Sequence, residues 1–335
     1  MSNMRITVIP GDGIGPSIMD ATLKVLDKLQ CGFAYDFAEC GQTSLDKGRE
    51  LLPQETLFLI KKNKIALKGP ITTPVGEGFT SMNVTLRKTF DLYANVRPAI
   101  SFPGTKSRYE NIDIITVREN TEGMYSGQGQ TVTEHGTHAE AVSVVTKHGA
   151  ERIVRFAFEL ARKNKRKKVT LVHKANILKS TSGLFLKTGR EVAPEFSDIA
   201  FGEMIVDNCC MQLVMNPYQF DVIVTTNLFG DILSDLCAGL VGGLGMAPAA
   251  NIGEGAAMFE AVHGSAPDIA TKNIANPTAV MLAAAMMLEH VGMLDKANRL
   301  RQAIRQTTEA KDRVTVDLGG TALTSEFTQA VLGRL

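Results

Sequence analysis

Two aspartates spaced one helical turn apart are the residues of this sequence best placed to do chemistry. Asp231 and Asp235 lie in the segment NLFGDILSD, residues 227–235. A spacing of four residues puts both carboxylates on one face of a predicted helix. Carboxylate oxygens suit Mg2+ or Mn2+, and no Cys or His flanks the pair as a zinc site would require. An acidic first turn set against the helix dipole is the alternative explanation.

Three arginines are candidates for binding a ligand with several carboxylates. Arg87 lies on a predicted helix, Arg97 lies just before a proline, and Arg118 ends a predicted strand. Each is therefore expected at an element boundary, where ligand sites of open α/β sheets gather. Arginine binds a carboxylate through a two-pronged pair, and Ser81 and Asn83 would add hydrogen-bonding groups. The sequence leaves open whether these side chains converge or each forms a surface ion pair.

Tyr125 and Lys174 have the character of proton-transfer groups. Tyr125 lies in a polar loop directly after a predicted strand, and Lys174 follows the apolar run 169–172 in the same position. Both side-chain types act as general acid or base when neighbours shift their pKa. A hydrogen-bonded tyrosine and a solvated lysine are the alternatives.

The elements that must position these residues alternate along the chain. Short apolar runs at 4–10, 65–67, 112–117, 169–172 and 222–226 predict strands, and amphipathic segments such as 18–29 predict helices between them. This alternation predicts an α/β fold with a largely parallel sheet. At 335 residues the chain favours two packed lobes. The segment 130–145, rich in Thr, Val and His, predicts a two-strand excursion.

The loop GDGIGP, residues 11–16, follows a predicted strand and precedes a predicted helix. A dinucleotide-binding Rossmann turn needs a third glycine where Pro16 stands, and an acidic residue about 20 positions later. A tight turn with proline at the first helical position explains the loop as well. We therefore do not expect a Rossmann fold, although the loop could line a cofactor site.

Composition excludes several partners. With 36 basic and 35 acidic side chains the formal charge is +1, which gives no reason to expect nucleic acid or an anionic membrane as partner. The basic run 162–168 is typical of a helix end and a loop. No apolar segment reaches transmembrane length, no leader is apparent, and five cysteines without a CxxC pair fit a reducing compartment. The expected location is cytoplasmic.

Six motifs in order along the chain resemble the β-decarboxylating dehydrogenases, which act on isocitrate, 3-isopropylmalate, homoisocitrate and tartrate or malate. The matching segments are GPITTP at 69–74, SMNVTLR with LYANVRP at 81–98, RENTE at 118–122, VHKAN at 172–176, residues 227–235, and HGSAPDIA at 263–270. The resemblance implies two domains enclosing a cleft. We expect a large domain from 1–95 and 245–335, and a small central domain, 96–244, with a clasp at about 123–147.

The resemblance also implies a homodimer with shared active sites. Lys174 and Asp207 would come from the partner subunit, and Asp207 would complete a metal site with Asp231 and Asp235. Lys174 would take the substrate hydroxyl proton as hydride leaves for nicotinamide. Tyr125 would return a proton after loss of CO2, with Mg2+ acting as a Lewis acid.

Substrate and cofactor preference follow from two further segments of the same resemblance. Isopropylmalate enzymes present apolar residues before the first arginine, whereas Ser81 and Asn83 suit the third carboxylate of isocitrate, the expected substrate. Homoisocitrate is the nearest alternative, although no Arg stands between 75 and 86.

Asp268 stands where NADP-using relatives have Lys, and its carboxylate would accept hydrogen bonds from ribose hydroxyls and repel a phosphate. NAD is therefore expected, with these lining residues: Thr72, Asn176, His263, Gly264, Ala266, Asp268, Ile269 and Asn276.

A non-catalytic regulatory chain is an alternative from another class, because some members of this family pair active with inactive chains. Inactive chains lose catalytic or metal positions. Every catalytic and metal position named above is present in this sequence. We therefore expect an active enzyme.

Overall fold

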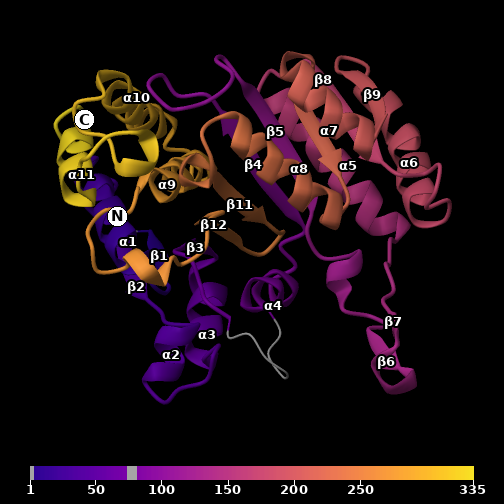
Figure 1. Cartoon of the computed structure of the whole chain (residues 1–335), viewed down its shortest axis with the longest axis horizontal. Helices are drawn as coiled ribbons and strands as arrows, with labels where there is room; N and C mark the ends of the chain where they lie inside the picture. The colour runs from indigo at the N-terminus through magenta and orange to yellow at the C-terminus, as the bar shows by residue number, and fades with distance from the viewer. Residues whose placement is uncertain (1–3, 74–80) are drawn as a thin grey trace.

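The computed structural model describes residues 4–73 and 81–335. One ten-stranded sheet runs through the molecule in the order β2-β1-β3-β12-β11-β4-β5-β10-β8-β9 (Figure 1). Its strands are β1 Arg5–Ile9, β2 Ala34–Phe37, β3 Ile65–Lys68, β4 Ala94–Ile100, β5 Asp113–Glu119, β8 Lys168–His173, β9 Ala200–Ile205, β10 Val222–Thr225, β11 Pro248–Ile252 and β12 Ala257–Ala261.

The sheet has parallel wings and an antiparallel centre. Strands β2, β1, β3 and β12 pair in parallel, as do β5, β10, β8 and β9. The pairs β12 with β11, β11 with β4, and β4 with β5 are antiparallel. The prediction of a largely parallel α/β sheet is confirmed, and the antiparallel centre is the part that the strand pattern did not indicate.

Helices cover both faces of the sheet. The long helices are α1 Gly15–Lys28, α3 Gln54–Asn63, α4 Met82–Thr89, α5 Lys147–Lys163, α6 Thr181–Val192, α7 Val206–Met215, α8 Asn227–Leu240, α9 Thr278–His290, α10 Leu294–Ala310 and α11 Thr324–Leu332, and α2 Gln42–Asp46 is short. One continuous core joins α1, α9, α10 and α5 to one face of the sheet, whereas α7 and α8 pack on the other face through a separate apolar cluster. Side chains alternate between the two faces along a strand, so on β8 Leu171 packs in the first core and Val172 in the second.

Both chain ends lie in the same half of the molecule, with α1, α9, α10 and α11, while the middle of the chain forms the other half (Figure 1). The junction between the halves falls between β11 and β4. The expected two-strand excursion is present as an antiparallel hairpin, β6 Thr131–Thr133 with β7 His138–Glu140, that projects from the body (Figure 1). Pro16 is the second residue of α1, which begins at Gly15, so it lies one position later in the helix than the loop analysis predicted.

The remaining composition predictions can be compared with the structure directly. The five cysteines, all within the described residues, are free thiols. The basic run ends α5 and leads to β8, and two of its arginines pair with carboxylates, Arg162 with Asp198 and Arg166 with Asp221. None of the described helices is long and apolar enough to cross a membrane.

Candidate active site

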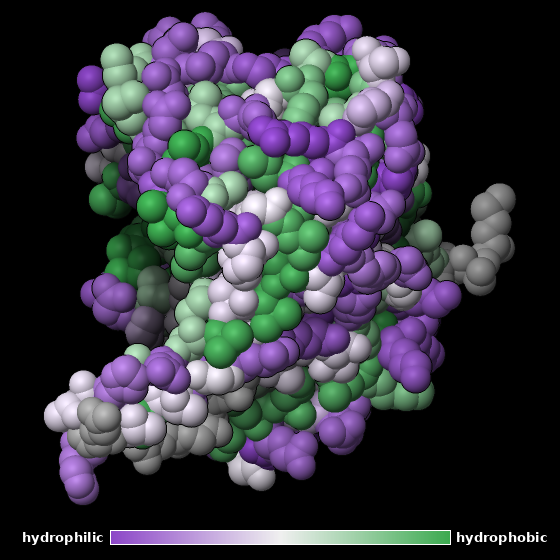
Figure 2. All heavy atoms as spheres, turned by 90° about the vertical axis from the view of Figure 1, so that its right-hand side faces the viewer, coloured by the Kyte–Doolittle hydropathy of each residue, from purple (hydrophilic) through white to green (hydrophobic). Residues whose placement is uncertain are grey.

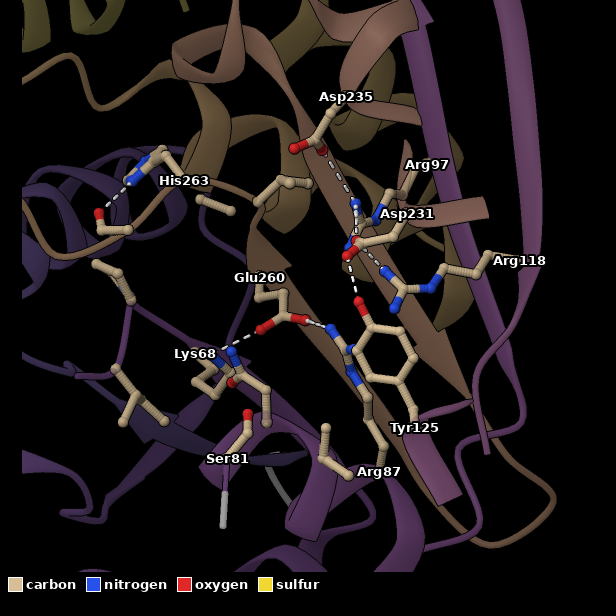
Figure 3. A pocket seen from close by; sticks show the side chains of 17 residues that line it. Lys68, Ser81, Arg87, Arg97, Arg118, Tyr125, Asp231, Asp235, Glu260 and His263 are labelled. Atoms are coloured by element: carbon tan, nitrogen blue, oxygen red, sulfur yellow. Dashed lines mark hydrogen bonds and ion pairs between the residues drawn. The ribbon is translucent and has the colours of Figure 1, made fainter. Parts of the chain in front are cut away.

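A cavity of about 310 Å³ opens at the centre of the sheet, between its two halves. Figure 3 shows that its charged side chains point toward one another from both halves of the chain. It gathers eight of the residues expected from sequence, namely Ser81, Asn83, Arg87, Arg97, Arg118, Tyr125, Asp231 and Asp235, together with His263 and Gly264 from the expected cofactor segment. The convergence that sequence left open is therefore present in the structure.

Asp231 and Asp235 lie one turn apart on α8 and both face the cavity (Figure 3). The Nη1 atom of Arg97 lies 3.3 Å from a carboxylate oxygen of each. Burial would raise the pKa of Asp231, but Arg118 and the Tyr125 hydroxyl lower it overall. Burial raises the pKa of Asp235, which Arg97 offsets only in part. The pair is thus a set of hard oxygen donors that remain open to the cavity and are held in place by neighbouring cations.

Arg97 corrects one expectation from the sequence. It lies in the middle of β4, not at an element boundary. Because side chains alternate across a strand, a mid-strand position still aims the guanidinium at one face. Its Nε donates to Oδ1 of Asn95 over 2.8 Å, and its Nη1 donates to Oγ of Ser234 over 2.8 Å. Burial and the nearby Arg87 lower the pKa of Arg97.

Arg118 is the most deeply buried of the three arginines, with a side chain only 1% exposed. It pairs with Asp231 and donates twice to Oδ1 of Asn227, from Nε over 3.0 Å and from Nη2 over 2.7 Å. Its guanidinium stacks over the Tyr125 ring at 5.0 Å from the centroid. Burial together with Arg97 and Arg87 lowers the pKa of Arg118 to about 10.

Tyr125 follows β5 in the short 3-10 turn Met124–Ser126. Its hydroxyl donates to Oδ2 of Asp231 over 2.6 Å. Burial and this carboxylate raise the pKa of Tyr125, so the phenol holds its proton at neutral pH. A protonated phenol at the edge of the cavity can act as a proton donor.

Two charged residues that the sequence analysis did not single out form the cavity floor. Glu260 on β12 is 4% exposed, and Lys68 at the end of β3 is 2% exposed. Lys68 Nζ lies 2.6 Å from Oε2 of Glu260, and Arg87 Nη2 lies 3.3 Å from Oε1 (Figure 3). Burial would raise the pKa of Glu260, but Lys68 and Arg87 hold it well below its usual range. The one sign of these two residues in the sequence was a charged side chain, Lys68, directly after the apolar run 65–67.

Three buried side-chain polar atoms at the cavity lack a partner in the described part of the chain. They are Nε of Arg87, Oδ1 of Asn83 and Nε2 of His263. Buried polar atoms are normally hydrogen-bonded, so these atoms are available to bond a ligand or water in the cavity. The segment 74–80, which belongs to the expected substrate-specificity region, lies outside the described residues.

Three loops interlock on the cofactor side of the cavity. Gly11 and Gly13 have φ of +79° and +57°, and a Cβ on them would lie 2.1 Å from the carbonyl oxygen of Pro70 and 2.0 Å from that of Ser265, respectively. These contacts require glycine. The Oγ1 atom of Thr72 lies 2.6 Å from Oγ of Ser265. The glycines therefore serve close backbone approach, and no dinucleotide fingerprint is needed to explain them.

Asp12 bonds to the same loops and has no cationic partner among the residues that the structure describes. Its carboxylate accepts from the backbone N–H groups of Gln42 at 3.0 Å, Thr43 at 2.7 Å and Thr72 at 2.7 Å. A fourth donor is the Thr43 hydroxyl at 2.6 Å. These bonds fix the backbone at Thr72, one of the expected cofactor residues.

The remaining expected cofactor residues differ in exposure. Burial lowers the pKa of His263, whose Nε2 atom is buried without a partner among the described residues. Ala266 adopts φ of +38° before the short turn Pro267–Ile269, where Asp268 is exposed. Asn276 is buried, and its Nδ2 donates to Oδ2 of Asp317 over 2.8 Å.

Lys174, Asn176 and Asp207 do not line this cavity. Lys174 pairs with Asp207, and the Asp207 side chain is 68% exposed. Asn176 is exposed on the same loop as Lys174. Within residues 4–73 and 81–335 no three His, Cys, Asp or Glu side chains form a metal-binding group. One chain therefore offers two carboxylates at the cavity and a separate, outward-facing lysine and aspartate.

Solved structures with the same fold include isocitrate dehydrogenase from Methylococcus capsulatus, which is 55% identical with a TM-score of 0.96 and 98% of each chain covered. The TT0538 protein from Thermus thermophilus is 48% identical with a TM-score of 0.94, covering 99% of this chain and 68% of that one.

Among curated sequences, the protein named as the alpha chain of human mitochondrial NAD isocitrate dehydrogenase is 48% identical over 98% of this chain and 90% of its own length. The Arabidopsis thaliana protein named catalytic subunit 5 of the mitochondrial NAD enzyme is 48% identical over 98% of this chain and 88% of its own. A Dictyostelium discoideum protein named as a regulatory chain of that enzyme is 48% identical over 99% of this chain and 92% of its own length. The model of the isocitrate/isopropylmalate dehydrogenase family matches residues 5–331. With this match over nearly its whole length, the chain belongs to the isocitrate/isopropylmalate dehydrogenase family.

Proposed function

We propose that this protein oxidises and decarboxylates isocitrate to 2-oxoglutarate and CO2, with NAD as the hydride acceptor and Mg2+ or Mn2+ as the required ion. The observation that carries this proposal is the convergence of three guanidiniums and two aspartates on one cavity. Arg87, Arg97 and Arg118 match a substrate with several carboxylates, because each guanidinium can bind a carboxylate through two hydrogen bonds.

Ser81 and Asn83 support isocitrate over an alkyl-bearing acid. Both line the cavity beside Arg87, and Oδ1 of Asn83 is without a partner among the described residues. An isopropyl group would leave the buried Oδ1 of Asn83 unpaired, at a cost of about 1 to 3 kcal/mol. A third carboxylate would accept from the Ser81 hydroxyl and the Asn83 NH2 group, and its bound water would donate to Oδ1 of Asn83.

The donor set at the cavity fits a divalent ion only in part. Asp231 and Asp235 supply hard oxygen atoms of the kind that Mg2+ and Mn2+ prefer. We propose that the remaining carboxylate is Asp207 of the partner subunit, since the aspartate of the same chain lies outside the cavity. The ion would supply Lewis-acid stabilisation of developing negative charge on the substrate oxygens.

Tyr125 and Lys174 are the proposed proton-transfer residues. Tyr125 lies at the cavity with its hydroxyl proton directed at Asp231, and it would protonate the carbon left after loss of CO2. Lys174 of the partner subunit would accept the hydroxyl proton of the substrate as hydride is transferred. Its outward-facing position on this chain is consistent with that role in a dimer.

NAD would occupy the side of the cavity formed by the interlocked loops. The proposed binding residues are Thr72, Asn176, His263, Gly264, Ala266, Asp268, Ile269 and Asn276. The exposed carboxylate of Asp268 is suited to ribose hydroxyls and opposes a 2′-phosphate. Cofactor preference therefore depends on this one charge more than on the cavity shape.

A homodimer would cover apolar side chains that are exposed in the single chain. On α7 these are Met211, Val214 and Met215, at 50%, 42% and 70% exposure, and on α8 Ile232 at 51%. Figure 2 shows a band of hydrophobic side chains on the side of the molecule that carries α6 and β9. The hairpin β6-β7 is the proposed clasp between subunits.

We further propose that the chain forms two domains, one from residues 1–95 with 245–335 and the other from residues 96–244. We also propose that the protein is cytoplasmic, although the curated relatives named above include mitochondrial proteins.

Initial rates test the proposal directly. Purified protein is assayed with isocitrate, homoisocitrate and 3-isopropylmalate, each with NAD and with NADP, before and after removal of divalent ions by a chelator. We expect the highest kcat/KM for isocitrate with NAD, and loss of activity on chelation that Mg2+ or Mn2+ restores. Faster turnover of another acid would overturn the substrate assignment, and a preference for NADP would overturn the role of Asp268.

A regulatory chain is the second candidate, supported by the name of the Dictyostelium relative. Such a chain would bind ligands without turning them over. The same assay on the purified single chain distinguishes the two, because a regulatory chain shows no NADH formation with any of the acids. Lys174→Met is the companion variant, since it abolishes turnover only if the chain is catalytic.

A further inference from the structure

Two buried amide side chains link strands β4 and β11 at the centre of the sheet. Asn95 on β4 lies directly opposite Asn251 on β11 in the antiparallel register. Both are almost completely buried, at 0% and 1% exposure. The Nδ2 atom of Asn95 donates to Oδ1 of Asn251 over 2.6 Å. The bond therefore joins the two segments of the proposed large domain, 1–95 and 245–335, at the strand in which the first segment ends.

Each amide also holds a group that belongs to the cavity. Asn251 Nδ2 donates over 2.8 Å to Oε1 of Glu260, the same oxygen that accepts from Arg87. Asn95 Oδ1 accepts from Nε of Arg97 over 2.8 Å. A continuous path of hydrogen bonds thus runs from Arg87 through Glu260 and the two asparagines to Arg97.

The groups at the ends determine how both amides must point. The ionised Glu260 can only accept hydrogen bonds, so Asn251 must turn its NH2 group toward it. The Arg97 guanidinium can only donate, so Asn95 must turn its oxygen toward it. This leaves the NH2 group of Asn95 to donate to the side-chain oxygen of Asn251. The same oxygen also accepts from Nδ2 of Asn120 over 3.0 Å. Flipping Asn95 would break two of these bonds, and flipping Asn251 would break three.

We propose that Asn95 and Asn251 are positioning residues that set the separation of Arg87 and Arg97, so that both guanidiniums engage substrate carboxylates at once. The proposal rests on the proposed function, because it takes the two arginines as substrate ligands. Neither asparagine lines the cavity, so both act through the groups they hold. When both guanidiniums are already fixed, substrate binding does not have to order them. If they were free to separate, part of the binding free energy would be spent on holding each one in place.

A double-mutant cycle tests the proposal. Asn95→Leu, Asn251→Leu and the double variant are compared with wild type in KM for isocitrate, KM for NAD and kcat. We expect each single variant to raise KM for isocitrate about tenfold or more, with KM for NAD little changed. The double variant should be no worse than the more impaired single variant, because either change already breaks the path.

Asn63→Leu is the matched control. Asn63 is a half-buried amide at the end of α3 that bonds Thr7 and Asp36, each at 3.0 Å, and does not line the cavity. It should leave both KM values unchanged. If the leucine variants fail to fold, the serine versions of the same positions give the same comparison, because a serine hydroxyl is too short to bridge both partners.

Three results would overturn the proposal: additive effects in the double variant, an equal rise in both KM values, or a fall in kcat alone that follows the fraction of folded protein. Failure of the proposed function is separate, because it appears in wild type as no turnover of isocitrate. The cycle is then run with whichever of the other two acids is turned over, since the two arginines would hold its carboxylates in the same way.

Discussion

At the residue scale, Arg118 lies against α8 at a place that only glycine permits. A Cβ on Gly230 would come within 2.6 Å of both Cβ and Cγ of Arg118. Gly230→Ala should therefore push the guanidinium away from Asp231 or shift α8, with a loss of about 1 to 3 kcal/mol of unfolding free energy. We expect KM for isocitrate to rise as well, measured by initial rates beside urea unfolding.

Gly239 supplies the control for this prediction within the same helix. A Cβ on Gly239 meets nothing within 4 Å. Gly239→Ala should leave KM unchanged and leave stability equal or slightly higher, because alanine favours a helix by about 1 kcal/mol over glycine. Equal effects of the two substitutions would show that helix propensity, and not contact with Arg118, governs Gly230.

Sequence reasoning found many of the groups that line the cavity but not the groups that hold them. Asp231 and Asp235 were predictable because helical spacing alone places them together. Asn95, Asn251 and Glu260 lie in apolar strands, where nothing local distinguishes a functional polar residue from a structural one. Their meeting depends on β11 lying between β12 and β4, and strand order across long connections is not encoded in periodicity.

At the element scale, Glu260 joins β12 to β3 through Lys68 and to α4 through Arg87. Glu260→Gln would leave Lys68 buried with no carboxylate opposite it. Breaking a buried pair in this way costs about 3 to 5 kcal/mol. We expect that loss at pH 7 in urea unfolding. The exposed Glu254, in the turn between β11 and β12, is the control, and Glu254→Gln should change stability by less than about 0.5 kcal/mol.

The ion pair between Glu260 and Lys68 also predicts that the free energy of unfolding depends on pH. The folded-state pKa of Glu260 lies below its ordinary value, so its ionised form stabilises the fold above the unfolded pKa of about 4.3. The difference in unfolding free energy between wild type and Glu260→Gln should be full at pH 7 and should shrink as the pH falls below about 4. A difference that grows on acidification would contradict the assigned ionisation of Glu260.

At the scale of the whole molecule, the residues of the proposed site lie in two separate places on one chain. Asp231, Asp235 and Tyr125 line it, whereas Lys174 and Asp207 pair with each other on an outward-facing surface. The exposed apolar side chains of α7 and α8 lie on the two helices that also carry Asp207 and Asp231. Dimerisation through these helices would therefore complete the site as it buries apolar surface, and dilution below the dimer dissociation constant should abolish activity.

Complementation between chains tests this sharing without disrupting the dimer. Asp207→Asn and Asp231→Asn chains carrying different tags are co-expressed, and the mixed dimer is isolated through both tags. One of its two sites then has an intact Asp231 with an intact Asp207 from the other chain, so activity should return to about half of wild type. A dimer that mixes Asp231→Asn with Asp235→Asn has a defect in both sites and should stay inactive. No recovery in the first pair would mean that each cavity draws its ligands from a single chain. Recovery in the second pair would mean that Asp231 and Asp235 do not serve the same site.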